Sequence, residues 1–287
     1  MSRLDASLDI DLASPREIVR IIQAEDARVA DAVERSAEEI ASAIDAIAHR
    51  LRNGGRLFYI GAGTSGRIAM LDAAELTPTF GVEAGLVQVI IAGGTSAMDQ
   101  AVEGAEDNAE DAVIAVGDLV HPTDCLVGIA ASGTTPFTVA AVREANRIGA
   151  LTVGVTSTPG SSLATDATIA IVTDVGAEVI MESSRMKSGT AQKLVLNTIS
   201  TGVMILLGHV HSNLMVDMPA TNTKLRSRAI RMVELAAGVD RETAEHALGQ
   251  SSTVREAIVV ASKGLSSEEA RLLLETHDGN LRKVLGK

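Results

Sequence analysis

The stretch LFYIGAGTSGRIAMLDAAE, residues 57–75, begins as an apolar run that predicts a strand and continues into a helical pattern. Between the two, glycines follow the spacing G-x-G-x-x-G, at Gly61, Gly63 and Gly66. A strand, a glycine-rich loop and a helix in this order place the first N–H groups of the helix where they bind phosphate. The loop also carries two hydroxyl side chains, Thr64 and Ser65. The stretch therefore predicts a phosphate-binding loop.

The second predicted strand argues against a dinucleotide cofactor at this loop. A dinucleotide site needs an acidic residue about 20 positions further on, at the end of the second strand, to bind the ribose. Here that strand ends in VIIAGG, residues 89–94, without an acid, and Glu83 stands before the strand. We therefore expect neither a nicotinamide nor a flavin.

A second loop of similar chemistry occurs in IAASGTTPF, residues 129–137. It comes after another predicted strand, precedes a helix that opens at Pro136, and supplies Ser132, Gly133, Thr134 and Thr135. Turns at the C-terminal ends of parallel strands converge on one ligand, and hydroxyl and N–H groups bind a phosphomonoester without a metal. The alternative is that these residues only cap helices.

The rest of the chain predicts an α/β architecture. Five short runs rich in Val and Ile, residues 56–63, 85–94, 125–133, 151–157 and 167–174, read as strands. Helical patterns cover 15–52 as two helices or one bent helix, then 97–116, 136–149 and about 190–210. Strands that are apolar throughout predict a parallel sheet covered on both faces, so we expect a three-layer domain of flavodoxin-like or Rossmann-like type.

After about residue 222 only short helical patterns remain. Turn signals separate them, at Gly238–Asp240, Ser251–Ser252, Gly264 and Asp278–Gly279. We expect a catalytic domain over residues 1–222 and a small all-helical domain over 223–287.

Composition excludes several classes of partner. The chain of 287 residues has a formal net charge of −12, which argues against nucleic acid and against an anionic membrane. It shows no signal peptide and no long uncharged apolar run, and its single cysteine, Cys125, fits a reducing compartment. We expect a cytoplasmic protein. Of six histidines only His209 and His211 have a metal-like spacing, and no third ligand stands nearby, so we expect no metal.

The two loops, GAGTSGR and ASGTTPF, resemble those of the SIS family of sugar-phosphate proteins. Further strings are more specific: LDAAELTPTFG, AVEGAEDN, SSRMKSGTAQKLVLN and NLMVDMPATNTKL resemble the N-acetylmuramic acid 6-phosphate etherases. The similarity runs from about residue 15 to the C-terminus. It implies an SIS domain, a C-terminal domain like a ubiquitin-associated fold, a cytoplasmic homodimer, a sugar-phosphate substrate and no metal or organic cofactor. The second loop has Thr134 where some members of the family carry Arg.

The reaction that this resemblance implies is cleavage of a D-lactyl ether at C3 of the sugar. Direct hydrolysis is difficult because alkoxide is a poor leaving group. In the ring-opened sugar, a base removes the C2 proton beside the aldehyde, an acid protonates the ether oxygen, and water then adds at C3. N-acetylglucosamine 6-phosphate and D-lactate result. The route needs two acid/base groups.

The resemblance assigns these roles to two glutamates. Glu75 matches the acid/base at the ether oxygen and at the attacking water, and Glu106 matches the base at C2, with Glu103 as its competitor; without the resemblance each reads as a solvated helix charge. Ten residues of helix from Ser65 to Glu75 would span about 15 Å, so we expect the helix to end early, at Thr77–Pro78.

The segment ESSRMKSGTAQK, residues 182–193, completes the candidate site with Ser183, Ser184, Arg185 and Lys187. Two cations at the start of a helix oppose its dipole, which predicts another partner for them: the lactyl carboxylate, the phosphate or a second subunit. The alternative is a pair of surface charges. Two other functions stay open from the residues alone, an aldose–ketose isomerase and a non-catalytic sugar-phosphate sensor such as the glucokinase regulatory protein.

Overall fold

The computed structural model describes residues 3–100, 102–220 and 222–286. Contacts within the chain divide it into two compact units. The sheet unit comprises the chain up to Ala73 together with Gly85–Val203, and the helical unit comprises Ala74–Ala84 together with the chain from Met204 on. The division into a catalytic domain, residues 1–222, and a small helical domain, residues 223–287, concerns function and stays a prediction.

The sheet unit is built on five parallel strands in the order β2-β1-β3-β4-β5. They are β1 (Leu57–Gly61), β2 (Val87–Ile91), β3 (Cys125–Ile129), β4 (Leu151–Thr156) and β5 (Ile169–Val172). All five predicted strands are confirmed. The register pairs Leu57 with both Val87 and Cys125, so the loops after β1 and β3 leave the same edge of the sheet side by side. The strand order reverses at this point, which is where open α/β sheets bind ligands.

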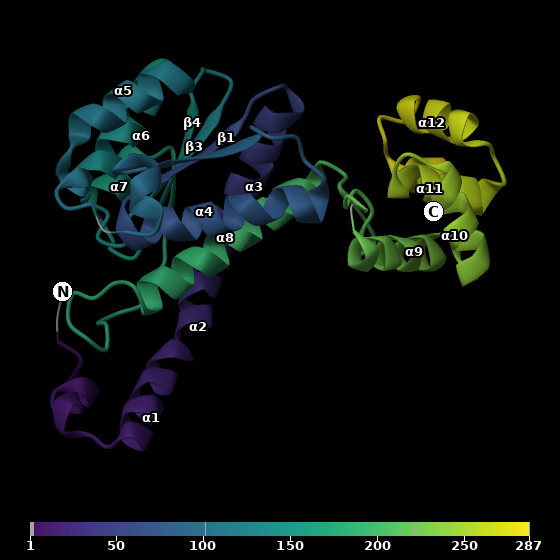
Figure 1. Ribbon diagram of the computed structural model, residues 1–287. Coiled ribbons are helices and arrows are strands. Elements are labelled where there is room, and N and C mark those ends of the chain that lie inside the picture. Colours follow the sequence, from purple (N-terminus) through teal and green to yellow (C-terminus); the bar gives the residue numbers. More distant parts are fainter. Residues whose placement is uncertain (1–2, 101, 221, 287) are drawn as a thin grey trace. The chain divides into compact units, whose positions relative to one another are not determined.

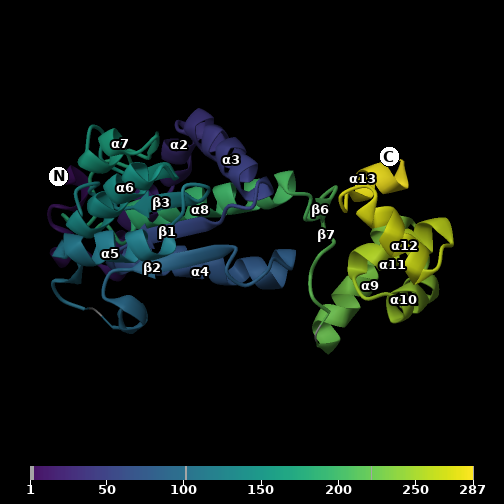
Figure 2. The ribbon, with the colours of Figure 1, turned by 90° about the horizontal axis from the view of Figure 1, so that it is seen from above.

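Helices cover both faces of the sheet, which confirms the three-layer α/β class. Figure 1 shows α5 (Ala109–Leu119), α6 (Pro136–Ile148) and α7 (Ser162–Asp166) on one face. On the other face lie the start of α4 (Gly63–Phe80) and α8 (Lys187–Leu206), below the strands in Figure 1 and overlapping them in the view of Figure 2. Phe58 and Ile60 of β1 are fully buried in the core shared with α5 and α6, as the two-residue period of a strand requires.

The side chain between them, Tyr59, belongs to a buried polar network that fixes α4 against the sheet. Its hydroxyl donates to Asp72 of α4 at 2.9 Å, and the same carboxylate accepts from Asn197 at 2.6 Å and from Ser200 at 3.0 Å, both on α8. Burial, together with the nearby Asp72 charge, raises the pKa of Tyr59 well above its ordinary value. The phenol therefore stays a donor, and β1, α4 and α8 are held in one arrangement behind the loop after β1.

The N-terminal region forms three helices rather than the expected one or two. After two short 3₁₀ turns, Asp5–Ser7 and Ile10–Leu12, come α1 (Pro15–Asp26), α2 (Val29–Glu34) and α3 (Ala37–Arg52). A capping box starts α1, in which Ser14 and Glu17 each accept a backbone N–H of the other.

The predicted helix over 97–116 is wrong in its first half. The chain instead forms 3₁₀ turns at Gly94–Met98 and Ala105–Asp107, and α5 begins only at Ala109. Gly104 has φ 74°, a left-handed conformation that interrupts a right-handed helix. Asn108 then caps α5 by accepting the N–H of Asp111.

The helical unit contains α9 (Thr223–Ala237), α10 (Arg241–Gln250), α11 (Val254–Lys263), α12 (Ser267–Glu275) and α13 (Leu281–Leu285). The predicted turns separate them, and Gly238 and Gly264 end helices in the left-handed conformation. A two-stranded hairpin, β6 (Val210–His211) with β7 (Leu214–Met215), is not predicted by the sequence. In the described part of the chain, no helix has the length and apolar character needed to span a bilayer.

The single cysteine, Cys125, is buried at the start of β3. Burial raises the pKa of its thiol from 9.0 to about 12. The thiol is therefore neutral and unreactive at physiological pH.

Candidate functional site

The loops after β1 and β3 line one cavity of about 590 Å³, here called the loop cavity. The first loop contributes Gly63, Thr64 and Ser65, and the second contributes Ser132 and Thr135. The predicted convergence of two hydroxyl-bearing turns is thus present in the structure. Such a cavity suits a small anion carried on a larger polar molecule.

The first loop presents the N-terminus of α4 to this cavity. The N–H of Gly66 bonds to the carbonyl of Ala62 at 3.3 Å, so the N–H groups of the preceding helical residues lack helical partners and are free for an anion. A Cβ at Gly66 would lie 2.6 Å from Cγ1 of Ile91 on β2. Only glycine lets the helix approach the strand this closely, which sets where its N-terminus points.

The second loop is shaped by Gly133. It has φ 65°, and a Cβ there would lie 2.1 Å from the hydroxyl of Ser161, so no other residue fits. The neighbouring Thr134 is exposed and donates its hydroxyl to Ser132 at 3.2 Å. Thr135 is the N-cap of α6 but makes no capping hydrogen bond with its side chain. Gly133 and Thr134 therefore shape the loop, while Ser132 and Thr135 face the cavity.

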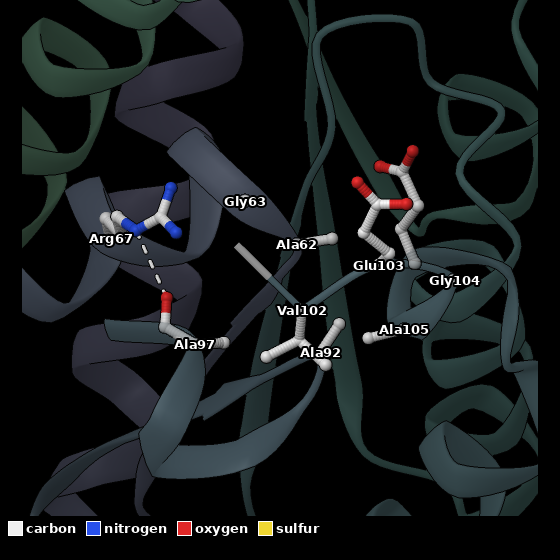
Figure 3. Close-up of a pocket in the computed structure, with 10 residues that line it drawn as sticks. Ala62, Gly63, Arg67, Ala92, Ala97, Val102, Glu103, Gly104 and Ala105 are labelled. Atoms are coloured by element: carbon white, nitrogen blue, oxygen red, sulfur yellow. Dashed lines mark hydrogen bonds between the residues drawn. The ribbon is translucent and has the colours of Figure 1, made fainter. Parts of the chain in front are cut away.

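Glu106 adds a carboxylate to the loop cavity. It lies on the 3₁₀ turn Ala105–Asp107 and is exposed. It also lines an adjoining cavity of about 380 Å³, here called the side cavity, together with Glu103 (Figure 3). Gly104 replaces the predicted helix with a turn, and Glu103 and Glu106, the two candidates for the base, line the same cavity.

Segment 182–187 contributes Glu182 and Ser184 to the loop cavity, whereas Ser183 and Arg185 are not among its lining residues. Glu182 has φ 66°, a left-handed conformation that a side chain makes unfavourable. The sequence predicts no role for Glu182. It also predicts none for Thr158, which lines the cavity from just beyond β4. Residues that follow the C-terminal ends of parallel strands line the site after β4 as they do after β1 and β3, so the position of Thr158 in the sequence could have predicted this role.

Lys187 has an internal partner, which corrects the expectation that it contacts the ligand. Its side chain is 1 % exposed, and its Nζ donates to Glu25 of α1 at 2.6 Å. The dipole of α8 is offset by another acid: buried Glu178 accepts the N–H groups of Lys187 at 3.1 Å and Ser188 at 2.9 Å. The charges at this helix start are thus balanced inside the protein.

The expected early end of α4 is also wrong. The helix continues to Phe80 with Pro78 inside it. Pro78 has no N–H to donate to the carbonyl four residues earlier, yet the chain keeps its helical conformation for two more residues. The described residues that line the two cavities all belong to the sheet unit, whereas Glu75 lies on the part of α4 that belongs to the helical unit.

No group of three or more His, Cys, Asp or Glu is arranged as metal ligands among the residues that the structure describes. His209 instead lies 2.8 Å from Asp217 through its Nδ1. Arg255 binds the same carboxylate. His209 thus has a protein partner within the helical unit.

Comparisons with known proteins identify the relatives of this chain. The family model for the glucokinase regulatory protein N-terminal SIS domain matches residues 39–146. A protein of Symbiobacterium thermophilum is 55% identical over 92% of this chain and 88% of its own, and one of Clostridium beijerinckii is 50% identical over 99% and 94%. Both are named N-acetylmuramic acid 6-phosphate etherase.

Solved structures show the same fold. The phosphoheptose isomerase of Neisseria gonorrhoeae superposes with a TM-score of 0.53 at 20% identity, covering 66% of this chain and 99% of its own. The phosphoheptose isomerase of Francisella tularensis gives 0.50 at 22% identity, covering 66% and 96%. At these identities the likeness concerns the fold alone.

Proposed function

Because the chain belongs to the N-acetylmuramic acid 6-phosphate etherases, we propose that its loop cavity holds the 6-phosphate of that sugar while glutamates move the protons. The protein is a carbon–oxygen lyase that converts N-acetylmuramic acid 6-phosphate into N-acetylglucosamine 6-phosphate and D-lactate, a step of peptidoglycan recycling. The observation that supports the site is one cavity lined by both hydroxyl-bearing loops and by Glu106.

The phosphate is bound by neutral donors. Thr64, Ser65, Ser132 and Thr135 supply hydroxyl groups, and the N-terminus of α4 supplies N–H groups and the positive end of a helix dipole. These groups bind a dianion locally although the chain carries a net charge of −12. Arg185, which is exposed, is the candidate to bind the lactyl carboxylate.

Glu106 is the base at C2. It lines the loop cavity, so a sugar whose phosphate lies between the two loops brings its other carbons toward this carboxylate. Removal of the C2 proton gives an enolate at C1, and its collapse expels lactate from C3 once the ether oxygen is protonated. Every step is a proton transfer, an elimination or an addition, so the reaction needs no metal and no organic cofactor.

Glu75 is the acid/base at the ether oxygen, and we assign it to the opposite subunit of a homodimer in the cytoplasm. The support is the length of α4: Ser65 and Glu75 are separated by ten residues of continuous helix, about 15 Å along its axis. A hexose phosphate held at the start of the helix is shorter than this. The partner subunit's Glu75 would complete each site.

The reaction is tested with isotopic water. Turnover of N-acetylmuramic acid 6-phosphate in ¹⁸O-water should release D-lactate and place the label at C3 of the sugar product. Label in the lactate would mean attack on the lactyl carbon and would exclude elimination. A sugar product that forms without lactate release would indicate an isomerase.

A further inference from the structure

The side cavity has an apolar floor beside the proposed reaction centre. Small aliphatic side chains line it, namely Ala62, Ala92, Ala97, Val102 and Ala105. Figure 3 shows Val102, Ala92 and Ala105 together at the base of the cavity, with the carboxylate of Glu103 above them. A cavity lined in this way suits a small apolar group carried by a polar one.

The side cavity adjoins the loop cavity. Ala62, Gly63 and Glu106 line both. A ligand atom at Glu106 therefore lies at the boundary of the two, and a substituent on that atom can enter the side cavity while the phosphate stays in the loop cavity.

The charges of the side cavity favour a neutral group over an anion. The cationic side chain that lines it, Arg67, is held by backbone carbonyls: Nε donates to those of Ala97 and Met98, each at 3.1 Å, and Nη2 donates to that of Gln100 at 2.9 Å. Two carboxylates on the same cavity outnumber its single positive charge. The carboxylates of Glu103 and Glu106 repel another carboxylate and accept an amide N–H.

We propose that the side cavity is the acyl subsite, which binds the 2-acetamido group of the substrate with its methyl on the alanine floor. This inference rests on the proposed function, because it is the C2 proton that Glu106 removes. The acetamido group is bonded to the same carbon, so it lies beside Glu106, and it is neutral where the lactyl group is charged. Val102 then limits the length of the acyl chain.

The size of the subsite predicts how selective it is. At about 380 Å³ it exceeds one acetyl group, since a water molecule occupies about 30 Å³ in the liquid. We expect N-propionyl and N-butyryl analogues of the substrate to be turned over, with kcat/KM falling by no more than roughly tenfold for each added methylene, the low end of the roughly 10–200-fold that one methylene makes in an apolar pocket.

The test varies the cavity wall and the acyl chain together. Val102 is 41% exposed, so both Val102→Phe and Val102→Ala should fold. The measured quantity is the ratio of kcat/KM for the N-butyryl substrate to that for the N-acetyl substrate, by D-lactate release. We expect Val102→Phe to lower this ratio about tenfold and Val102→Ala to raise it severalfold.

The matched control is Val113 on α5, which is 39% exposed and lines neither cavity. Val113→Phe and Val113→Ala should leave the ratio at the wild-type value. An unchanged ratio in Val102→Ala, or in a folded Val102→Phe, overturns the acyl subsite even though lactate is released. A wild-type protein that releases no lactate from the N-acetyl substrate overturns the proposed function instead.

Discussion

Glu182 combines a left-handed backbone with a carboxylate at a cavity proposed to bind an anion. The backbone conformation is unfavourable for a residue with a Cβ, at a cost of about 1–2 kcal/mol. The charge is unfavourable for the ligand, because a carboxylate repels a phosphate. Residues in strained conformations are found preferentially at functional sites, where the surrounding structure holds them.

Two substitutions separate these effects. Glu182→Ala removes the charge and keeps the Cβ, whereas Glu182→Gly removes both. We expect both variants to lower KM by about fivefold, since one like charge at a solvated site contributes on the order of 1 kcal/mol. Only Glu182→Gly should also raise the free energy of unfolding, by about 1 kcal/mol relative to Glu182→Ala. Equal stabilities by thermal unfolding would show that the backbone here is unstrained.

Asp124 makes the stability of the sheet unit depend on pH. Burial disfavours its charged form, but hydrogen bonds from the Arg56 side chain and from the backbone N–H groups of His121 and Arg56 outweigh burial and lower the pKa of the carboxyl. A lowered folded-state pKa stabilises the fold above the unfolded value of about 3.9. This contribution is lost as the pH falls through the folded pKa.

The variant Asp124→Asn lacks that charge at every pH. At pH 7 we expect its free energy of unfolding to be lower by about 2 kcal/mol, because hydrogen bonds to a charged acceptor are lost. The difference in the free energy of unfolding between Asp124→Asn and wild type should become smaller below about pH 4. Denaturant titrations at a series of pH values measure it, and a constant gap would contradict the assignment.

Among elements, α1 is tied to α8 by the buried pair of Glu25 and Lys187. Removing one partner of a buried pair leaves the other charge unpaired, which typically costs about 3–5 kcal/mol. We expect Glu25→Met, which leaves the buried Lys187 ammonium without this partner, to destabilise by about this amount. Lys187→Met should destabilise by less, because Glu25 keeps its ion pair with Arg28 at 3.2 Å. The variant with both changes should be markedly less destabilised than the sum of the single changes. Urea unfolding of the three variants measures this coupling.

Lys187→Met also tests whether Lys187 binds the ligand. Since its ammonium faces Glu25, the KM of folded Lys187→Met should stay within roughly threefold of wild type. A tenfold rise in KM would return Lys187 to the ligand site.

The elements also show how far sequence reasoning reaches. The five strands are predictable because each is a short apolar run rich in Val and Ile. The break in the helical pattern at Gly104 is not predictable from the sequence, because Ala, Val and Glu recur there at helical spacing. The pairing of Lys187 is not either, since Glu25 lies 162 residues away in sequence. Both cavity loops are predictable, whereas the role of Glu182 depends on its backbone conformation.

At the scale of the whole molecule, the proposed homodimer predicts sites shared between subunits. Glu75→Gln and Glu106→Gln should each be inactive alone. After subunit exchange, half of the dimers carry one of each, and one of their two sites then has both glutamates intact. We expect recovery of about one quarter of wild-type activity, the value for random exchange in a twofold-symmetric dimer.

The control for this experiment is a measurement of mass. Analytical ultracentrifugation should find dimers before mixing, and native mass spectrometry with one variant made heavier by isotope labelling should find dimers of intermediate mass afterwards. Confirmed exchange without recovered activity would place Glu75 in its own chain's site, and a monomer would exclude the homodimer.

The burial of Cys125 has a practical consequence. With this thiol neutral and buried within the sheet, a maleimide dye added to the native enzyme should find nothing to label. A cysteine introduced at one exposed position would then be the sole attachment point, without first removing the natural one. Two introduced cysteines, one on the sheet unit and one on the helical unit, would carry paired fluorophores that report, in single molecules, the distance between them during turnover.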